Sequence, residues 1–176
     1  MSDTSTPDTS TGRAALRDQA LSDQLRAVHE MLRRDLAAVR ALAARVASGA
    51  AAEEVHDVLA DLRTQGPLFQ LQVSCLTWCQ TVHSHHSGED AQLFPAVRRS
   101  APHLAETVDR LEQDHRRVQV LLAEVETLAQ GLDGEGARGR LVTALDELST
   151  HLLEHLALEE RVIGPVLDSW DGWPQP

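Results

Sequence analysis

Two short stretches of the sequence combine histidine, carboxylate and proline in the same order. The first is HHSGEDAQLFP, residues 85–95, and the second is HLALEERVIGP, residues 155–165. Both read His, any three residues, Glu, an acidic residue, any two, Leu or Ile, any one, and Pro. Residues four apart share one face of an α-helix, so each stretch can offer a His and a Glu to the same site. Imidazole together with carboxylate suits iron or another first-row transition metal.

The elements that carry these stretches are predicted to be helices, because apolar residues recur at helical spacing through almost the whole chain after residue 13. The expected long helices cover about 14–48, 67–99, 102–130 and 139–169, and a short helix covers about 53–64. No alternating run or hairpin turn predicts a strand. We therefore expect an all-α fold: an antiparallel up-down four-helix bundle, with a short extra helix between the first and second long helices.

The length of 176 residues suits a single domain. We expect a polar, disordered N-terminal tail at 1–12, the bundle at 13–169 and a C-terminal tail at 170–176. The first residues do not resemble a signal peptide, and no apolar run approaches the ~18 residues of a membrane-spanning helix.

Charge and cysteine content narrow the functional class. The formal net charge of -11 argues against binding to nucleic acid or to an anionic membrane, since both need a basic patch. Cys75 and Cys79 fall one helical turn apart, where a disulfide is geometrically awkward. We expect them to fill the core of a reduced, cytoplasmic protein, with a thiol redox pair as the alternative.

Each long helix points at least one histidine toward the bundle interior, and two helices add a glutamate one turn on. A buried, ionised glutamate is costly unless a cation or hydrogen-bond donors compensate it. Metal binding meets that requirement most simply. The candidate metal ligands are His29, His85, Glu89, His115, His155 and Glu159.

The candidate ligands form a half-repeat, in which a helix with one histidine precedes a helix with the His-x-x-x-Glu pair. His29 precedes His85 and Glu89 in the first half, and the second half repeats the order. Two equivalent halves would present their ligands to one centre. Two metal ions bridged by two carboxylates follow naturally, because each glutamate can span both ions with its two oxygens.

Some histidines remain ambiguous in the sequence. His86 competes with His85 as the ligand of its helix, and the repeat favours His85 because Leu156 stands at the counterpart of His86. His151 lies one turn before His155 and could be a further ligand or a supporting partner. The histidines expected on the surface are His56, His83 and His103.

Four segments of the chain, in this order along the sequence, resemble the hemerythrin-like, or HHE cation-binding, family. These are HEMLRRDL from His29, HHSGEDAQLFP, DHRRVQVLL containing His115, and HLALEERVIGP, and they span about residues 25–167. The resemblance implies a non-haem centre of two oxo- or hydroxo-bridged iron ions, and chemistry with O2, nitric oxide or peroxide. It makes His29, His85, His115 and His155 terminal ligands, and Glu89 and Glu159 bridges.

The chain departs from the oxygen-carrying members of that family. Those members have His-x-x-x-His on the third helix, whereas Leu111 and Gln119 lie one turn either side of His115 here. They end in His-x-x-x-x-Asp, where this chain has His-x-x-x-Glu. Sensing, detoxification, storage or a peroxidase- or catalase-like turnover is therefore expected rather than simple O2 carriage. Nothing in the sequence indicates a pocket for a large organic substrate.

Other functions remain open from the sequence. The main alternative is a non-catalytic iron- or oxygen-sensing or metal-binding module that acts through a partner. A ferritin-like oxidase or a metal-free structural bundle would also give a helical bundle. Zinc or manganese could replace iron, and the sequence does not indicate the oligomeric state.

Overall fold

The computed structural model describes residues 20–48, 67–132 and 136–173, and these are helical almost throughout, without a strand. The predicted short helix at 53–64 and the predicted disordered tail at 1–12 lie outside the described residues. The elements are α2 (Leu21–Ala47), α4 (Pro67–Gly88), the π-helix η1 (Glu89–Leu93), α5 (Phe94–Ser100), the 3₁₀ turn η2 (Pro102–Leu104), α6 (Ala105–Gln130) and α7 (Ala137–Leu167).

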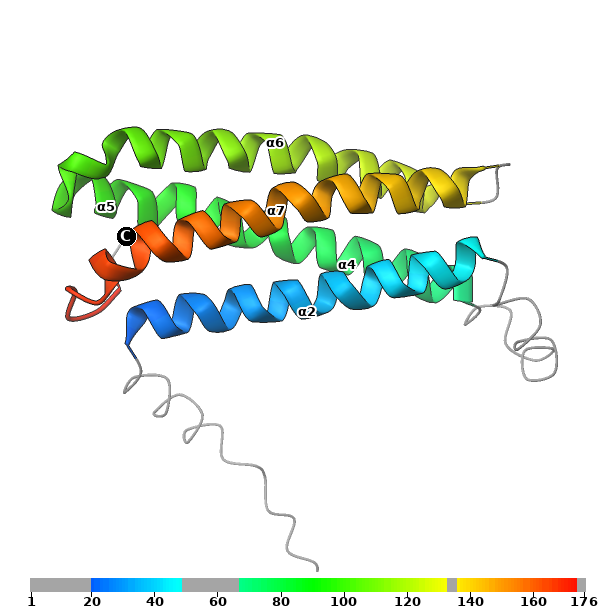
Figure 1. Cartoon of the computed structure of the whole chain (residues 1–176), viewed down its shortest axis with the longest axis horizontal. Helices are drawn as coiled ribbons and strands as arrows, with labels where there is room; N and C mark the ends of the chain where they lie inside the picture. Colours follow the sequence, from blue (N-terminus) through cyan, green and yellow to red (C-terminus); the bar gives the residue numbers. More distant parts are fainter. Residues whose placement is uncertain (1–19, 49–66, 133–135, 174–176) are drawn as a thin grey trace, which may run out of the picture.

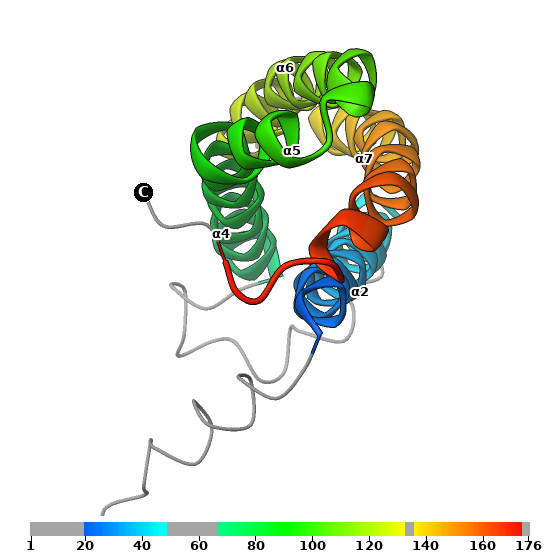
Figure 2. The same cartoon turned by 90° about the vertical axis from the view of Figure 1, so that its left-hand side faces the viewer.

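The long helices form the predicted antiparallel up-down bundle. Helix α2 packs against α4 and α7, and α6 packs against the same two helices from the other side. Viewed end on, the four helices stand at the corners of a square (Figure 2), and successive helices run in opposite directions (Figure 1). Helices α4, η1 and α5 follow one another without a break and together make up one side of the bundle.

The turn of η1, at Glu89–Leu93 between α4 and α5, is wider than an α-helical turn. Pro95 has no backbone N–H to donate to the carbonyl of Ala91, and its ring crowds that carbonyl. The Phe94 N–H donates to the carbonyl of Glu89, five residues back, rather than to that of Asp90, four residues back. Such π turns often mark functional sites. Pro165, the counterpart of Pro95 in the sequence repeat, lies inside α7 without producing a π turn there.

The apolar core is divided into two clusters along the bundle axis. The larger fills the half containing the end of α2 and the start of α4, with Leu36, Leu145 and Leu148 among its members. The smaller one lies at the opposite end, around Leu93, Phe94 and Ile163. The stripes of α2 and α6 pass from one cluster to the other, so the residues between the clusters occupy a separate layer.

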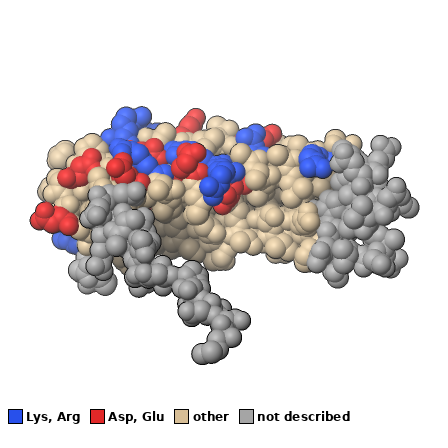
Figure 3. Space-filling view, turned by 90° about the horizontal axis from the view of Figure 1, so that it is seen from below, with Lys and Arg blue, Asp and Glu red and all other residues tan. Residues whose placement is uncertain are grey.

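Basic and acidic side chains interleave on the surface seen from below the view of Figure 1 (Figure 3). Exposed ion pairs join neighbouring helices, as Arg117 Nη2 does with Glu147 Oε1 at 2.7 Å. Because exposed pairs contribute at most about 1 kcal/mol each, the two apolar clusters supply most of the stability. None of the described helices is both long and apolar enough to cross a membrane.

We predict that Leu148→Ala lowers the free energy of unfolding by about 2–5 kcal/mol, because Leu148 is fully buried and its removal leaves a cavity. Leu153→Ala, at a side chain 37% exposed on the same helix, is the matched control and should change it by less than about 1 kcal/mol. Urea denaturation of both variants under the same metal conditions measures the difference. Equal effects would contradict this assignment of the core.

Candidate metal centre

A layer of polar side chains separates the two apolar clusters. On α2, His29 follows Leu25 of the smaller cluster and precedes Leu32 of the larger. On α6, His115 occupies the same place between Leu111 and Val118. Helical spacing therefore brings histidines to the level where the apolar core is interrupted. The fully or almost fully buried members of this layer are His29, His86, Glu89, His115, His155 and Glu159.

Three of these side chains and the partly buried His85 form what we call the two-histidine group: His29, His85, Glu89 and Glu159. One ligand atom from each lies within 4.8 Å of all the others. His29 Nε2 is 3.2 Å from His85 Nε2 and 3.4 Å from Glu159 Oε2. His85 Nε2 is 3.1 Å from Glu89 Oε1. These nitrogen and oxygen atoms face a common centre, as the ligands of one cation must.

The three-histidine group consists of His86, Glu89, His115 and His155, again with one atom of each inside 4.8 Å. His115 Nε2 lies 3.0 Å from His155 Nε2. The ring of His86 stacks on that of His115, with 4.0 Å between the ring centroids, and meets His155 edge-on at 5.1 Å. All four side chains of this group are buried.

The two carboxylates lie between the groups. Glu89 directs Oε1 toward His85 and Oε2 toward His115, at 3.1 Å and 3.6 Å from their Nε2 atoms. Glu159 Oε2 lies 3.4 Å from Nε2 of His29 and 3.7 Å from Nε2 of His155. Each carboxylate therefore contacts a histidine of both groups.

Many polar atoms of the site have no hydrogen-bond partner among the described residues. They are both oxygens of Glu89 and of Glu159, both ring nitrogens of His86, and Nδ1 of His155. Neighbouring imidazoles approach the carboxylate oxygens, but none is aligned to donate a hydrogen bond. Leaving so many buried polar groups unsatisfied is costly, and cation coordination removes that cost. The cluster thus fits a metal-binding site.

The surroundings of three of the histidines lower their pKa values and so keep the imidazoles neutral. Burial, reinforced by the neighbouring histidines, lowers the pKa of His85 to about 4 and that of His115 to about 2. The pKa of His86 is lowered still further for the same reasons. Neutral imidazole is the form that binds metals.

The pKa values of Glu89 and His29 are instead raised. Burial, with repulsion from Glu159, raises the pKa of Glu89 to about 8. Burial also acts to lower the pKa of His29, but attraction to Glu159 and Glu89 outweighs it and raises the value to about 9. Two buried carboxylates therefore draw a proton to the site when no other cation is bound.

The second acidic residue of each repeated stretch holds a histidine of a neighbouring helix. His115 donates from Nδ1 to Asp90 Oδ1 at 2.7 Å, and His29 donates from Nδ1 to Glu160 Oε1 at 2.8 Å. Arg33 Nη2 holds the same Glu160 oxygen at 2.8 Å. A hydrogen on Nδ1 leaves the Nε2 lone pair of neutral imidazole facing the centre, and such outer carboxylates commonly orient metal-binding histidines.

The structure brings together all six side chains that the sequence analysis gave as candidate metal ligands. It also places His86 in the same cluster. The sequence treated His85 and His86 as alternatives, whereas here each joins a different group. His151 is exposed and belongs to neither group, and His83 and His103 are exposed as predicted. His56 lies outside the described residues. Cys75 and Cys79 are free thiols buried in the larger cluster.

The two halves of the repeat differ beside the site. Phe94 is fully buried and stacks on His115 at 5.1 Å between ring centroids. Its counterpart in α7 is Gly164, where an added Cβ would lie 3.8 Å from Ser22 and 3.6 Å from Arg26 of α2. Helix α7 therefore comes close to α2 at a position where the other half carries an aromatic ring.

Comparison with known proteins identifies a family. Residues 20–167 match the family model described as the hemerythrin HHE cation-binding domain. No curated protein and no solved structure matches the chain.

We predict that Asp90→Asn and Glu160→Gln each weaken metal binding by about 10–100-fold, because each removes the carboxylate that orients a histidine. Competition with a coloured chelator measures the affinity. Glu124→Gln, which neutralises an exposed carboxylate elsewhere on α6, is the control and should leave the affinity unchanged. If all three variants bound metal alike, Asp90 and Glu160 would have no role in orienting the site.

Proposed function

The chain belongs to the hemerythrin HHE cation-binding domain family, and from this premise we propose that it is a di-iron protein that binds or reacts with O2, nitric oxide or peroxide. The observation that carries the proposal is the sharing of buried carboxylates between two separate groups of histidines. A single cation would use only one of these groups.

Ligand types support iron, and their arrangement supports two ions. Five imidazoles and two carboxylates make a donor set suited to first-row transition metals. We assign His29 and His85 to one ion, and His86, His115 and His155 to the other. Glu89 and Glu159 would bridge the two, since each contacts histidines of both groups. The two carboxylates would also offset part of the positive charge of the two ions.

The site is open on one side. The His85 side chain is 12% exposed and that of Glu89 is 7% exposed, whereas His29 and Glu159 are fully buried. The three-histidine group is buried throughout. An incoming small molecule would therefore reach the ion that has fewer nitrogen ligands, and this is the ion with more coordination positions left for a ligand.

The chain's own residues determine what such a centre can do. Iron bound there would supply redox chemistry and Lewis acidity toward a small oxygen- or nitrogen-containing ligand. His86, which stacks on His115 and meets His155 edge-on, and the apolar clusters on either side exclude water from the back of the site. Asp90 and Glu160 keep the ligand histidines oriented.

Two further parts of the proposal rest on the sequence. A cytoplasmic location is consistent with the free thiols of Cys75 and Cys79, since reducing compartments keep thiols unpaired. A sensing module would need a surface for its partner. The sequence offers the N-terminal tail and segment 53–64 as candidates, and both lie outside the described residues.

We predict that the purified protein holds about two iron ions per chain, as di-iron bundles do, and that a His155→Ala, Glu159→Ala double variant loses most of them. Elemental analysis gives the metal content and separates iron from zinc or manganese. His151→Ala removes an exposed histidine one turn away and should keep the full complement. Equal iron in the double variant and in the control would rule out this ligand set.

The same preparation tests the reaction. Mixing the reduced, iron-loaded protein separately with O2, nitric oxide and hydrogen peroxide should change its visible absorption with at least one of them. Repeated consumption of peroxide would indicate an enzyme, and a reversible change with O2 or nitric oxide would indicate a carrier or sensor. A full complement of iron without a response to any of the three would contradict the proposed chemistry.

We predict that His86→Leu lowers the metal content by about one ion per chain, because it removes one of three nitrogens from a single group. Leucine is the residue that the repeat itself carries at the equivalent position, Leu156, which is buried. His83→Leu is the control, since His83 is exposed on the same helix. A variant that still bound two ions would show that His86 only fills space.

A further inference from the structure

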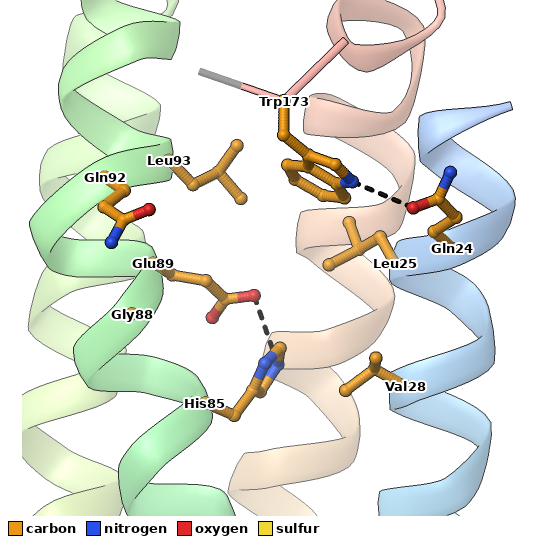
Figure 4. Close-up of a pocket in the computed structure, with 9 residues that line it drawn as sticks. All are labelled: Gln24, Leu25, Val28, His85, Gly88, Glu89, Gln92, Leu93 and Trp173. Atoms are coloured by element: carbon orange, nitrogen blue, oxygen red, sulfur yellow. Dashed lines mark hydrogen bonds and ion pairs between the residues drawn. The ribbon is translucent and has the colours of Figure 1, made fainter. Parts of the chain in front are cut away.

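A pocket of about 380 Å³ lies directly outside the two-histidine group. It lies between α2 on one side and the end of α4 with η1 on the other (Figure 4). His85 and Glu89 form its floor, and Trp173 lies at the opposite end. The remaining lining residues are Gln24, Leu25, Val28, Gly88, Gln92 and Leu93.

The pocket is far larger than a diatomic gas or hydrogen peroxide requires. A water molecule occupies about 30 Å³ in the liquid, and the pocket exceeds that more than tenfold. Pockets for small organic ligands begin at about 300 Å³. The space therefore suits a ligand with an organic body.

The lining indicates the chemistry of that body. Leu25, Val28, Leu93 and the indole of Trp173 provide an apolar wall. Among the described residues that line the pocket there is no Lys or Arg, and the only carboxylate is that of Glu89 at the floor. An anionic or cationic body would lose its hydration there without gaining a partner. An uncharged apolar body is favoured, with its polar end at the floor.

The segment after α7 completes the pocket. After Leu167 the chain turns back across the end of the bundle, and this segment is the red loop in Figure 2. Trp173 Nε1 donates to Gln24 Oε1 of α2 at 2.9 Å, which holds the indole over the pocket. The side chain is still 40% exposed, so the pocket opens to solvent beside it.

We propose that this pocket binds organic hydroperoxides, and the alcohols of the same carbon skeleton, with the oxygen end at His85 and Glu89. The proposal rests on the proposed function insofar as peroxide is a ligand of the adjacent metal position, and it extends that ligand class from hydrogen peroxide to peroxides with an apolar body. Trp173 and Leu25 contact the apolar body of the ligand, and its oxygen end lies at the pocket floor.

Calorimetric titration with 2-phenyl-2-propanol, the unreactive alcohol counterpart of cumene hydroperoxide, tests the proposal. Gly88→Leu is the blocking variant, because Gly88 lines the pocket in a helical conformation and an added Cβ meets nothing within 4 Å. Gly139→Leu makes the same change in equally open helical surroundings on α7, outside the residues that line the pocket. The expected result is saturable binding by the parent and by Gly139→Leu, weakened at least tenfold in Gly88→Leu.

Trp173→Ala provides a second test, because it removes part of the wall without touching a candidate ligand. It should weaken alcohol binding several-fold and leave the iron content unchanged. No saturable binding by the parent, or equal binding by Gly88→Leu, would overturn the proposal.

The titration also separates this inference from the function on which it rests. A protein that holds two irons but does not bind the alcohol would contradict the pocket alone. A protein that binds the alcohol in a manner sensitive to Gly88→Leu, yet holds no metal, would contradict the di-iron function and leave the pocket standing.

Discussion

Glu89 and Glu159 bring two carboxylates into the middle of a helical bundle, where 5% and 0% of these residues remain exposed. Charges so deeply buried must be compensated. The division of the apolar core into two clusters, the inward turn of five imidazoles and the retention of a proton near His29 all answer that requirement. The bundle accordingly gains from a bound cation twice, through coordination and through relief of repulsion between the carboxylates.

The fold and most of the site could be predicted because both follow from helical periodicity. His115 and His155 lie within apolar stripes and His29 lies at the edge of one, so each helix directs its own histidine toward the interior. His86 lies at the margin of a stripe, where a side chain can turn to either neighbour. Its place is decided by the rings of α6 and α7, which no pattern within α4 reveals.

Other features depend on contacts between distant parts of the chain. The second acidic residue of each repeated stretch, Asp90 or Glu160, has a partner only because another helix presents an Nδ1 atom to it. The pocket takes its walls from α2, from the junction of α4 with η1 and from Trp173 beyond α7. Helix propensity and apolar periodicity describe one segment at a time. The contacts of Asp90 and Glu160 and the pocket therefore could not be deduced from the sequence alone. Pro95 was visible in the sequence, but Pro165 shows that a proline there need not widen the turn.

The contrast between Phe94 and Gly164 has a consequence for symmetry. The repeated stretches imply a pseudo-twofold axis through the site that would exchange one half of the bundle with the other. An aromatic ring on one side and a bare backbone against α2 on the other abolish that axis. The site consequently has a front and a back: one face is sealed by packed rings and the other meets the solvent. The repeat in the sequence therefore does not produce two equivalent groups in the structure: the two-histidine group meets the solvent, and the three-histidine group is enclosed.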